Sequence, residues 1–321
     1  MPALSQYPNI TSKNVIGMFF QEMEIAANRS WVSQITNEFT SNQATETYAG
    51  LGTVPQMREW LGGKQGKNFR EQSLTITNKD WESTIEVAVK DLRRDKTGQL
   101  QIRIAELAER ATAHDAKLIS DLIENGTGTT KGSCYDGLAF FADTHSVGSS
   151  GTIDNEKDVD ISAVPVATHG TTTDPSVGEF VHAVLDGVSL IQSFKDDQGE
   201  PINENASSFL VMVPTGLSKV ARLALSQQMI SDGENNPLIA DTINYNIVSN
   251  ARLTWTDKFA VFRSDGRSKS FISQLEMAPM LKLLAEGSDY EFTNNAHLYS
   301  VEKCGNVGYG RFDQAALITL T

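Results

Sequence analysis

The sequence is poor in the residues that mark disulfide scaffolds, metal sites and membrane proteins. Only two cysteines, Cys134 and Cys304, occur in 321 residues, and the five histidines are scattered without metal-ligand spacing, which excludes a disulfide framework and a zinc cage. No stretch approaches the roughly 18 uninterrupted apolar residues of a membrane span, and the first residues lack a secretory pattern. We therefore expect no metal, no cofactor and no membrane, with the cytoplasm as the default compartment.

Positive charge is also scarce. The chain carries 27 Lys and Arg against 40 Asp and Glu, a formal net charge of -13. A protein that reads nucleic acid needs a basic face to displace phosphate counterions, so this balance argues against that class. With 40% hydrophobic and 21% charged residues, the chain can bury a core, and its length allows one to three domains.

Signals for catalysis are weak. The stretch 126–132 superficially resembles a phosphate-binding loop, but it follows a predicted helix and lacks the Gly-Lys-Ser/Thr order that cradles phosphates. Asp143, His145 and Ser146 offer an acid, a base and a hydroxyl, yet residues so close in one loop rarely align as a relay, and no Gly-x-Ser-x-Gly elbow is present. We expect a structural turn here and no enzyme; a nucleotide-binding enzyme using the 126–132 stretch is the competing hypothesis.

The strongest local pattern predicts one long amphipathic helix over residues 99–125. Its apolar positions recur at steps of three or four, and charged residues occupy the opposite side. Asn125-Gly126 supplies a C-terminal stop, and the helix would be on the order of 40 Å long. The apolar stripe consists of Leu100, Ile104, Leu107, Ala111, Leu118 and Leu122, widened by Ala108, Ile119 and Ile123.

Two alternating segments precede this helix. Residues 73–77 and 84–90 alternate polar with apolar side chains, and Asn78-Lys79-Asp80 offers turn residues between them. The pattern predicts a pair of half-buried strands that protrudes as a ribbon, preceded by a polar, basic stretch at 61–68. Because the open edges of such a ribbon invite pairing, we expect a second subunit to cover it.

The rest of the chain mixes helices and strands without a regular βαβ rhythm, which indicates an α+β protein. Residues 126–175 are rich in loops. The apolar patterns predict helices at 180–191, 217–225 and 280–284, and strands at 209–213, 243–248, 259–263, 292–299 and 312–320.

Several of these segments resemble, in order, the major capsid proteins of tailed bacteriophages, and most closely the Mu-like major head subunit. The resemblance implies a Hong Kong 97-type capsid fold. Its parts would be an N-terminal arm at 1–45, an extended loop at 46–82, a peripheral domain at 83–200 with the spine helix at 99–125, an axial domain at 201–286, and a return to the peripheral domain at 287–321. The segments that carry the resemblance are 48–60, 81–95, 140–145 and 308–317.

The resemblance also implies a function. The chain would be a structural capsid protein that assembles into pentamers and hexamers, forming an icosahedral head shell in the virion, assembled in the host cytoplasm, that encloses DNA without reading its sequence. Implied partners are a separate scaffold protein, a head protease and a portal; a decoration protein stays open. An encapsulin-like nanocompartment shell is the alternative within the same fold.

A small set of residues is expected to contact a neighbouring subunit. Basic side chains against an acidic body would favour one docking orientation, and aromatic side chains could anchor the contact. The alternative that these aromatic rings pack beneath their own strands stays open. The candidates are Trp60, Lys64, Lys67, Phe69, Arg70 and Trp81.

Overall fold

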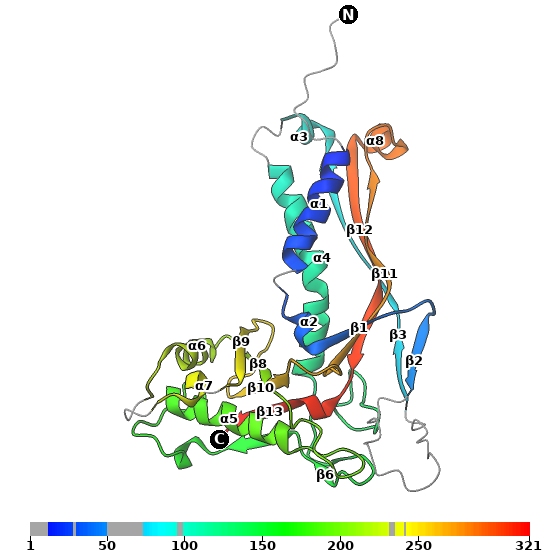
Figure 1. Ribbon diagram of the computed structural model, residues 1–321. Coiled ribbons are helices and arrows are strands. Elements are labelled where there is room, and N and C mark those ends of the chain that lie inside the picture. The colour runs from blue at the N-terminus through cyan, green and yellow to red at the C-terminus, as the bar shows by residue number, and fades with distance from the viewer. Residues whose placement is uncertain (1–11, 28–29, 50–72, 95–98, 231–234, 241) are drawn as a thin grey trace, which may run out of the picture.

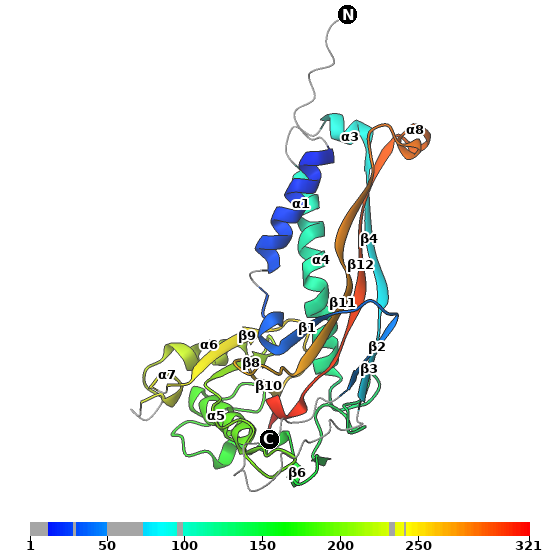
Figure 2. The ribbon, with the colours of Figure 1, turned by 45° about the vertical axis from the view of Figure 1, so that its right-hand side comes forward.

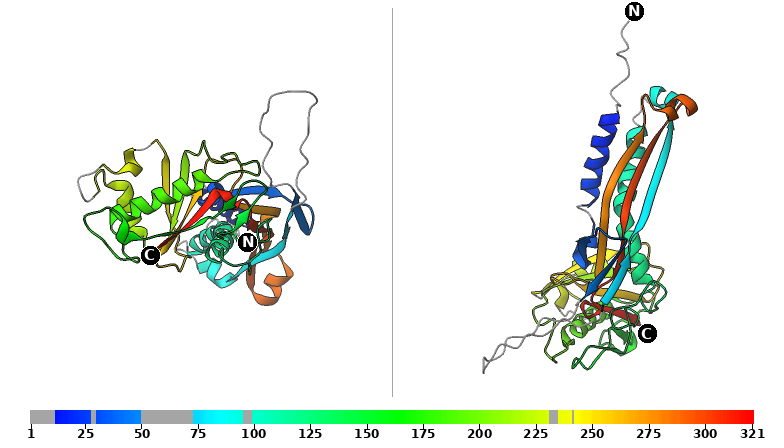
Figure 3. Two further views of the ribbon diagram at one scale, coloured as in Figure 1. Left: turned by 90° about the horizontal axis from the view of Figure 1, so that it is seen from below. Right: turned by 90° about the vertical axis from the view of Figure 1, so that its right-hand side faces the viewer.

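The chain folds into two lobes that share one long helix and one C-terminal segment (Figure 1). The computed structural model describes residues 12–27, 30–49, 73–94, 99–230, 235–240 and 242–321. Figure 3 shows the long lobe standing on the compact lobe, with a helix and a sheet running side by side along its length. Within the described ranges, no helix is both long and apolar enough to cross a bilayer.

The long lobe is a four-stranded sheet covered on one face by two helices. The sheet order is β1-β11-β12-β4, with β1 parallel to β11 and the other neighbours antiparallel. Helix α4 has 26 residues and a length of about 39 Å, and α1 packs along it (Figure 2). The bounds are α1 Ser12–Ala27, β1 Thr36–Thr40, β4 Lys79–Ala88, α4 Gln99–Glu124, β11 Phe271–Leu284 and β12 Ala296–Tyr309.

Helix α4 connects two separate cores. Near its start, Ile104 and Leu107 pack with Phe19 of α1 and with Tyr299 and Val301 of β12. Near its end, Ile119, Leu122 and Ile123 belong to the core of the compact lobe. The predicted long helix is thus confirmed within one residue at its end, and its apolar stripe serves both lobes in turn.

The compact lobe is a five-stranded sheet in the order β7-β13-β10-β8-β9. Helix α5 packs on β10 and β13 and against α6 and α7. The approach is close at Gly187, where a Cβ atom would lie 3.0 Å from Val261 Cγ2, so glycine lets α5 reach the sheet. The bounds are β7 Glu156–Val159, α5 Val177–Ser193, β8 Ser208–Val213, α6 Ser218–Ser226, α7 Pro237–Ala240, β9 Asn244–Ser249, β10 Lys258–Arg263 and β13 Ala315–Leu320.

Shorter elements complete the chain. Strands β2 and β3 pair antiparallel beside the long lobe, and α3 and α8 lie at its far end, away from the compact lobe (Figure 2). Their bounds are α2 Val32–Ile35, β2 Thr45–Ala49, β3 Ser73–Thr77, α3 Val89–Arg94, β5 His145–Ser146, β6 Thr152–Ile153, η1 Ile161–Ala163, α8 Asp289–Asn294 and η2 Phe312–Gln314.

The predicted pairing of the two early strands is wrong. Strand β3 pairs with β2, whereas β4 pairs with β12. Only Asn78 separates β3 from β4, and the chain continues in the same direction instead of turning back. The side-chain Nδ2 of Asn78 donates to Gln43 O at 2.8 Å and to Glu276 Oε2 at 2.9 Å. Asn78 therefore fixes the point where one extended segment passes from one sheet to another.

The predicted helix at 280–284 is also wrong, since these residues form the end of β11. Leu281 and Leu283 face the helices of the long lobe, while Met280 and Leu284 are exposed on the other face. A short apolar run does not distinguish a helix from a strand by itself, and pairing with β12 decides the outcome.

Two predicted strands start later than expected. The segment 292–299 begins in α8, and β12 starts only at Ala296. The segment 312–320 begins with the 3-10 turn η2 before β13. In both cases a short helical turn near the strand start holds apolar residues that alternation alone assigns to the strand.

The lobes take elements from more than one of the predicted domain intervals. Helix α5 from 83–200 packs on β10 from 201–286, whereas β11 from 201–286 pairs with β12. The predicted boundaries at 45, 82, 200 and 286 divide the chain by the position that each part would take in a capsid shell. They stay a prediction.

Candidate functional site

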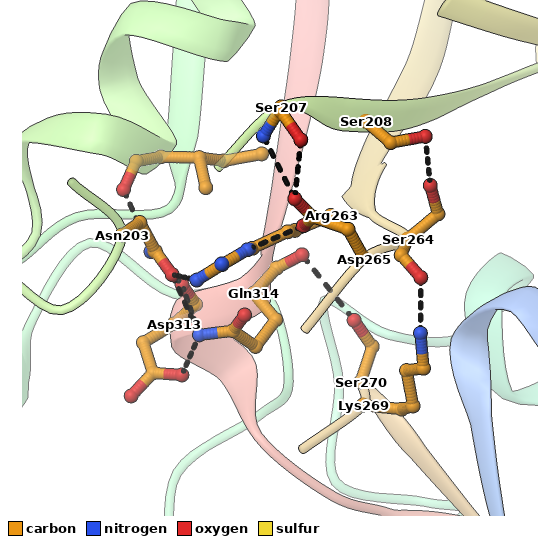
Figure 4. A network of polar contacts seen from close by, with 11 residues as sticks. Asn203, Ser207, Ser208, Arg263, Ser264, Asp265, Lys269, Ser270, Asp313 and Gln314 are labelled. Atoms are coloured by element: carbon orange, nitrogen blue, oxygen red, sulfur yellow. Dashed lines mark hydrogen bonds and ion pairs between the residues drawn. The ribbon is translucent and has the colours of Figure 1, made fainter. Parts of the chain in front are cut away.

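The two linkers that connect the lobes, 264–270 and 310–314, meet in a polar network (Figure 4). Arg263, at the end of β10, donates from Nε to Asp265 Oδ1 at 2.7 Å and from Nη1 to Asn203 Oδ1 at 3.0 Å. Asn203 Nδ2 in turn donates to Asp313 O at 2.8 Å, and Gln314 Nε2 donates to Asn203 Oδ1 at 2.9 Å. The amide of Asn203 thereby ties both linkers to the compact lobe.

The other side of the network fixes the linker between β10 and β11. Asp265 Oδ2 accepts from Ser207 N at 2.8 Å and from Ser207 Oγ at 2.9 Å. Lys269 Nζ donates to Ser264 O, and Ser270 Oγ donates to Gln314 O at 3.4 Å. Burial alone would raise the pKa of Asp265, but the hydrogen bonds from Arg263 and Ser207 outweigh burial and lower it.

A buried ion pair and stacked rings lie beside this network. Arg311 donates to both carboxylate oxygens of Asp313, and both side chains are buried. Burial by itself would lower the pKa of the Arg311 guanidinium, but Asp313 outweighs it and raises that pKa. Phe312 stacks on His145, with ring centroids 3.8 Å apart. The turn between β12 and β13 is therefore fixed by a buried ion pair within it and by stacking of Phe312 on His145.

His145 has a structural role in this arrangement. It is fully buried, and its Nδ1 lies 2.5 Å from Asp136 Oδ2. Sequence reasoning considered Asp143 and Ser146 beside His145 and missed Asp136, because the loop that brings Asp136 close has no periodic pattern. Its contacts with Asp136 and with the ring of Phe312 hold this loop in place, which agrees with the expected structural turn.

The lysine of the stretch 126–132 forms an exposed ion pair with the preceding helix. Lys131 Nζ lies 2.6 Å from Asp121 Oδ2 of the preceding helix α4. Across the described ranges, no cluster of three His, Cys, Asp or Glu side chains could hold a metal ion. We call the two linkers 264–270 and 310–314 together with Asn203 the junction of the lobes. The polar groups of the junction described above bond to one another, and this network can fix the angle between the lobes.

Of the residues expected to contact a neighbour, one can be placed. Trp81 lies on β4, donates from Nε1 to Gly305 O at 2.9 Å, and contacts the His114 ring at 4.5 Å between centroids. Its ring thus packs within its own chain, as the open alternative had it, and any further contact with a neighbour stays a prediction. The other candidates, Trp60, Lys64, Lys67, Phe69 and Arg70, lie outside the described residues.

Trp81 also lines a pocket of about 400 Å³ between the two cores that α4 connects. We call it the mid-lobe pocket. Apolar groups of Trp81, Ala111 and Val301 line it, together with the exposed basic side chains of Arg110, Lys117 and Arg252. No local motif marks this pocket, because β12 and the loop around Arg252 lie more than one hundred residues from β4 and α4 along the chain.

His114 on α4 lines this pocket and is half-buried. Burial lowers its pKa, and the positive charge of Lys303 lowers it further. Lys303 itself pairs with Asp115. Within the described part of the chain, the buried Nδ1 of His114 has no hydrogen-bond partner.

The arrangement of the lobes matches solved shell proteins. The procapsid protein of bacteriophage JBD30 aligns with 96% of this chain and 74% of that chain, at 20% identity and a TM-score of 0.54. The mature capsid of bacteriophage PhiM1 aligns with 91% of this chain and 87% of that one, at 11% identity and a TM-score of 0.52. A virus-like particle from Pyrococcus furiosus aligns with 95% of this chain and 98% of its own, at 7% identity and a TM-score of 0.51. The chain has the Hong Kong 97-type capsid fold, as predicted.

Sequence similarity is narrower and more particular. Residues 13–169 match the family model of the Mu-like prophage major head subunit gpT. The major head subunit of the Mu-like prophage FluMu of Haemophilus influenzae is 30% identical over 135 residues, or 42% of this chain and 43% of that protein. The major capsid protein of Escherichia phage Mu is 28% identical over 118 residues, which is 37% of this chain and 38% of that protein. The predicted similarity to Mu-like head subunits is confirmed, over less than half the length of each relative.

Proposed function

We propose that this chain is the major capsid protein of a Mu-like phage or prophage. It would assemble into pentamers and hexamers that close an icosahedral head around DNA. The observation that carries the proposal is the coincidence of two similarities: the capsid fold covers 96% of the chain, and residues 13–169 match the Mu-like head subunit family. A shell subunit needs association surfaces and no active site, and this agrees with the occupied polar groups at the junction.

The fold alone would fit an encapsulin-like nanocompartment as well, since the solved structures are at most 20% identical to this chain and show only the fold that the two classes share. The sequence match to Mu-like head subunits favours the phage class. In a phage, the partners would be a scaffold protein, a head protease, a portal and DNA, and the assembled chain would be part of the virion, built in the host cytoplasm.

Electron microscopy with light scattering on the purified chain tests the proposal, with and without its neighbouring genes. Closed or aberrant shells tens of nanometres across, or rings of five or six subunits, are expected. A uniform monomer or dimer under every condition, including co-expression with a scaffold protein, would overturn it. Shells that enclose a cargo enzyme and no DNA would favour the nanocompartment.

The stretch 62–68 offers a test of the proposed intersubunit contact. Replacing these seven residues by Gly and Ser keeps the chain length and removes Lys64 and Lys67. We expect a folded subunit with normal circular dichroism that forms no closed shells. Normal shells from this variant would remove these lysines from the proposed contact.

A further inference from the structure

The far tip of the long lobe presents an aromatic ring to solvent. Phe292 on α8 is 94% exposed. Exposed apolar residues are common on protein surfaces, but a phenyl ring with almost no contact to its own chain is a typical anchor of a protein interface. Figure 2 shows α8 beyond the start of α4, at the opposite end from the compact lobe.

The support beneath this ring is firmly built. Ser288 caps α8 by accepting from Glu291 N at 3.2 Å, and Glu291 Oε2 accepts from Gly287 N at 2.7 Å. Asn295 ends the helix in the left-handed conformation, with φ at 50° and its N–H donating to Glu291 O at 2.8 Å. Because the backbone of α8 is already ordered, binding would cost only the rotamer freedom of the Phe292 side chain.

The tip is acidic. The segment 283–296 contains Glu286, Asp289 and Glu291 and has no Lys, Arg or His, and the next residue, His297, lies with its Nε2 3.2 Å from Glu291 Oε1. A surface that receives Phe292 should therefore combine an apolar floor with a basic rim.

The mid-lobe pocket has these two properties. Its floor includes Trp81, Ala111 and Val301, and Arg110, Lys117 and Arg252 stand at its rim. Among the described residues, the structure shows no carboxylate paired with any of these three rim side chains. Glu82 also lines the pocket and accepts a hydrogen bond from Thr84 at 2.7 Å.

A chain cannot bring its own tip to its own pocket. The pocket lies along α4 from Arg110 onward, about 17 Å or more from the helix start by the rise per residue. Both the tip and the pocket belong to the same paired strands and helices, so no hinge connects them. The complementary charges of the tip and the pocket therefore point to a second copy as the occupant.

We propose that Phe292 of one copy inserts into the mid-lobe pocket of a second copy, with the acidic tip against the basic rim. This contact joins two different surfaces, so it is head-to-tail, and repetition leads to a ring or an open chain and not to an isolated pair. The inference rests on the proposed shell function, for which it names a specific contact between subunits.

Disulfide trapping tests the contact while keeping Phe292. In a Cys304→Ser background, Thr293→Cys marks the tip and Ser83→Cys marks the pocket; both positions are exposed. Under mild oxidation, the double variant should give a ladder of dimers, trimers and larger species on a non-reducing gel. Each single variant alone should stay monomeric, and a mixture of the two should stop at dimers.

Dimers from Thr293→Cys alone would mean that tips meet tips, which would overturn the proposal. If electron microscopy shows assembled particles but the double variant gives no ladder, this contact is wrong while the shell function stands. A ladder without any closed particle or ring of five or six would keep the contact and overturn the shell function. The absence of both would overturn both.

A charge exchange gives a second, independent test. We expect the concentration needed for assembly to rise about tenfold in Asp289→Lys, and equally in the double variant Arg110→Glu, Lys117→Glu. The three changes together should return this concentration to that of the unchanged protein. Phe292→Ala should act like the single exchanges, whereas Met229→Ala, an equally simple truncation at an exposed site on the compact lobe, should not. Normal assembly of Phe292→Ala and of both charge variants would overturn the proposal.

Discussion

The two lobes use the same kinds of element but bury them to different extents. In the compact lobe, β8, β10 and β13 are covered on both faces, and the core includes Phe180 and Phe259. In the long lobe, only one face of the sheet lies under α4 and α1, and the opposite face leaves Met280 and Leu284 exposed. The compact lobe is therefore self-sufficient, whereas in the described part of the long lobe the second sheet face is covered by β2 and β3 at Ile272 and is exposed at Met280 and Leu284.

Phe259→Ala should have the largest effect, because it removes a fully buried ring that packs against Phe180 at 5.0 Å between centroids. We expect a loss of about 3–5 kcal/mol in the free energy of unfolding. Denaturant unfolding followed by circular dichroism measures this loss. A loss below about 1 kcal/mol would show that the compact lobe is less self-sufficient in its packing than its burial indicates.

Phe19→Ala makes the same chemical change in the long lobe, at an equally buried ring. Phe19 belongs to a small cluster between α1, α4 and β12, so we expect a local loss of about 3 kcal/mol. Amide hydrogen exchange in α1 should then accelerate roughly 100-fold, with β8 and β10 unchanged. Equal acceleration in both lobes would remove the distinction between them.

Glu179→Gln tests a buried carboxylate at the start of α5. Glu179 accepts from Ser176 N at 2.7 Å and from Gly170 N at 3.0 Å. Burial would raise its pKa, but these hydrogen bonds and that from His169 prevail and lower it. Because the folded-state pKa is depressed, the carboxylate stabilises the fold fully above its ordinary value of 4.5, and this contribution is lost as pH falls through the folded value.

At pH 7 we therefore expect Glu179→Gln to lower the free energy of unfolding by about 2 kcal/mol, as for a hydrogen bond to a charged group. Thermal unfolding of both proteins between pH 7 and pH 3 measures the difference, which should shrink below pH 4.5. A difference that does not change with pH would mean that the introduced amide destabilises the fold through its hydrogen-bonding geometry and not through the loss of the negative charge.

Trp81→Phe should have the smallest effect. It removes the hydrogen bond from Nε1 to Gly305 O and keeps an aromatic ring beside His114, so we expect about 1 kcal/mol. Trp31→Phe is the control, since Trp31 packs on the compact core and the structure shows no hydrogen bond from its indole within the described residues. Equal losses in the two variants would assign the effect to ring size.

Local sequence patterns predicted α4, α5, α6, β8 and β10 because each buries one continuous face or run. The choice of strand partners could not be predicted in this way. Strand β4 takes β12, more than two hundred residues later, and Asn78 directs it there through contacts with Gln43 and Glu276. Alternation indicates that a strand exists, but it carries no information about which edge the strand meets.

The site was predicted less completely than the fold. The resemblance to Mu-like head subunits supplied the fold, and the comparisons confirmed it. The mid-lobe pocket and the network around Asn203 combine side chains from distant segments, so no local motif marks them. The exposure of Phe292 was not predicted, because alternation assigned this residue to a strand, whereas it lies on the short helix α8 and faces solvent.

The path of residues 271–320 has a consequence for the order of folding. This segment supplies β11 and β12 to the long lobe and then β13 to the compact lobe. Strands β8, β9 and β10 with α5 and α6 are close in sequence and can form early, whereas β4 and β1 wait for partners more than two hundred residues away in the chain, and closing such a loop is slow. We expect both sheets to be completed in one late step, so that a chain without a finished compact lobe also lacks the mid-lobe pocket that we propose as the site for a second copy.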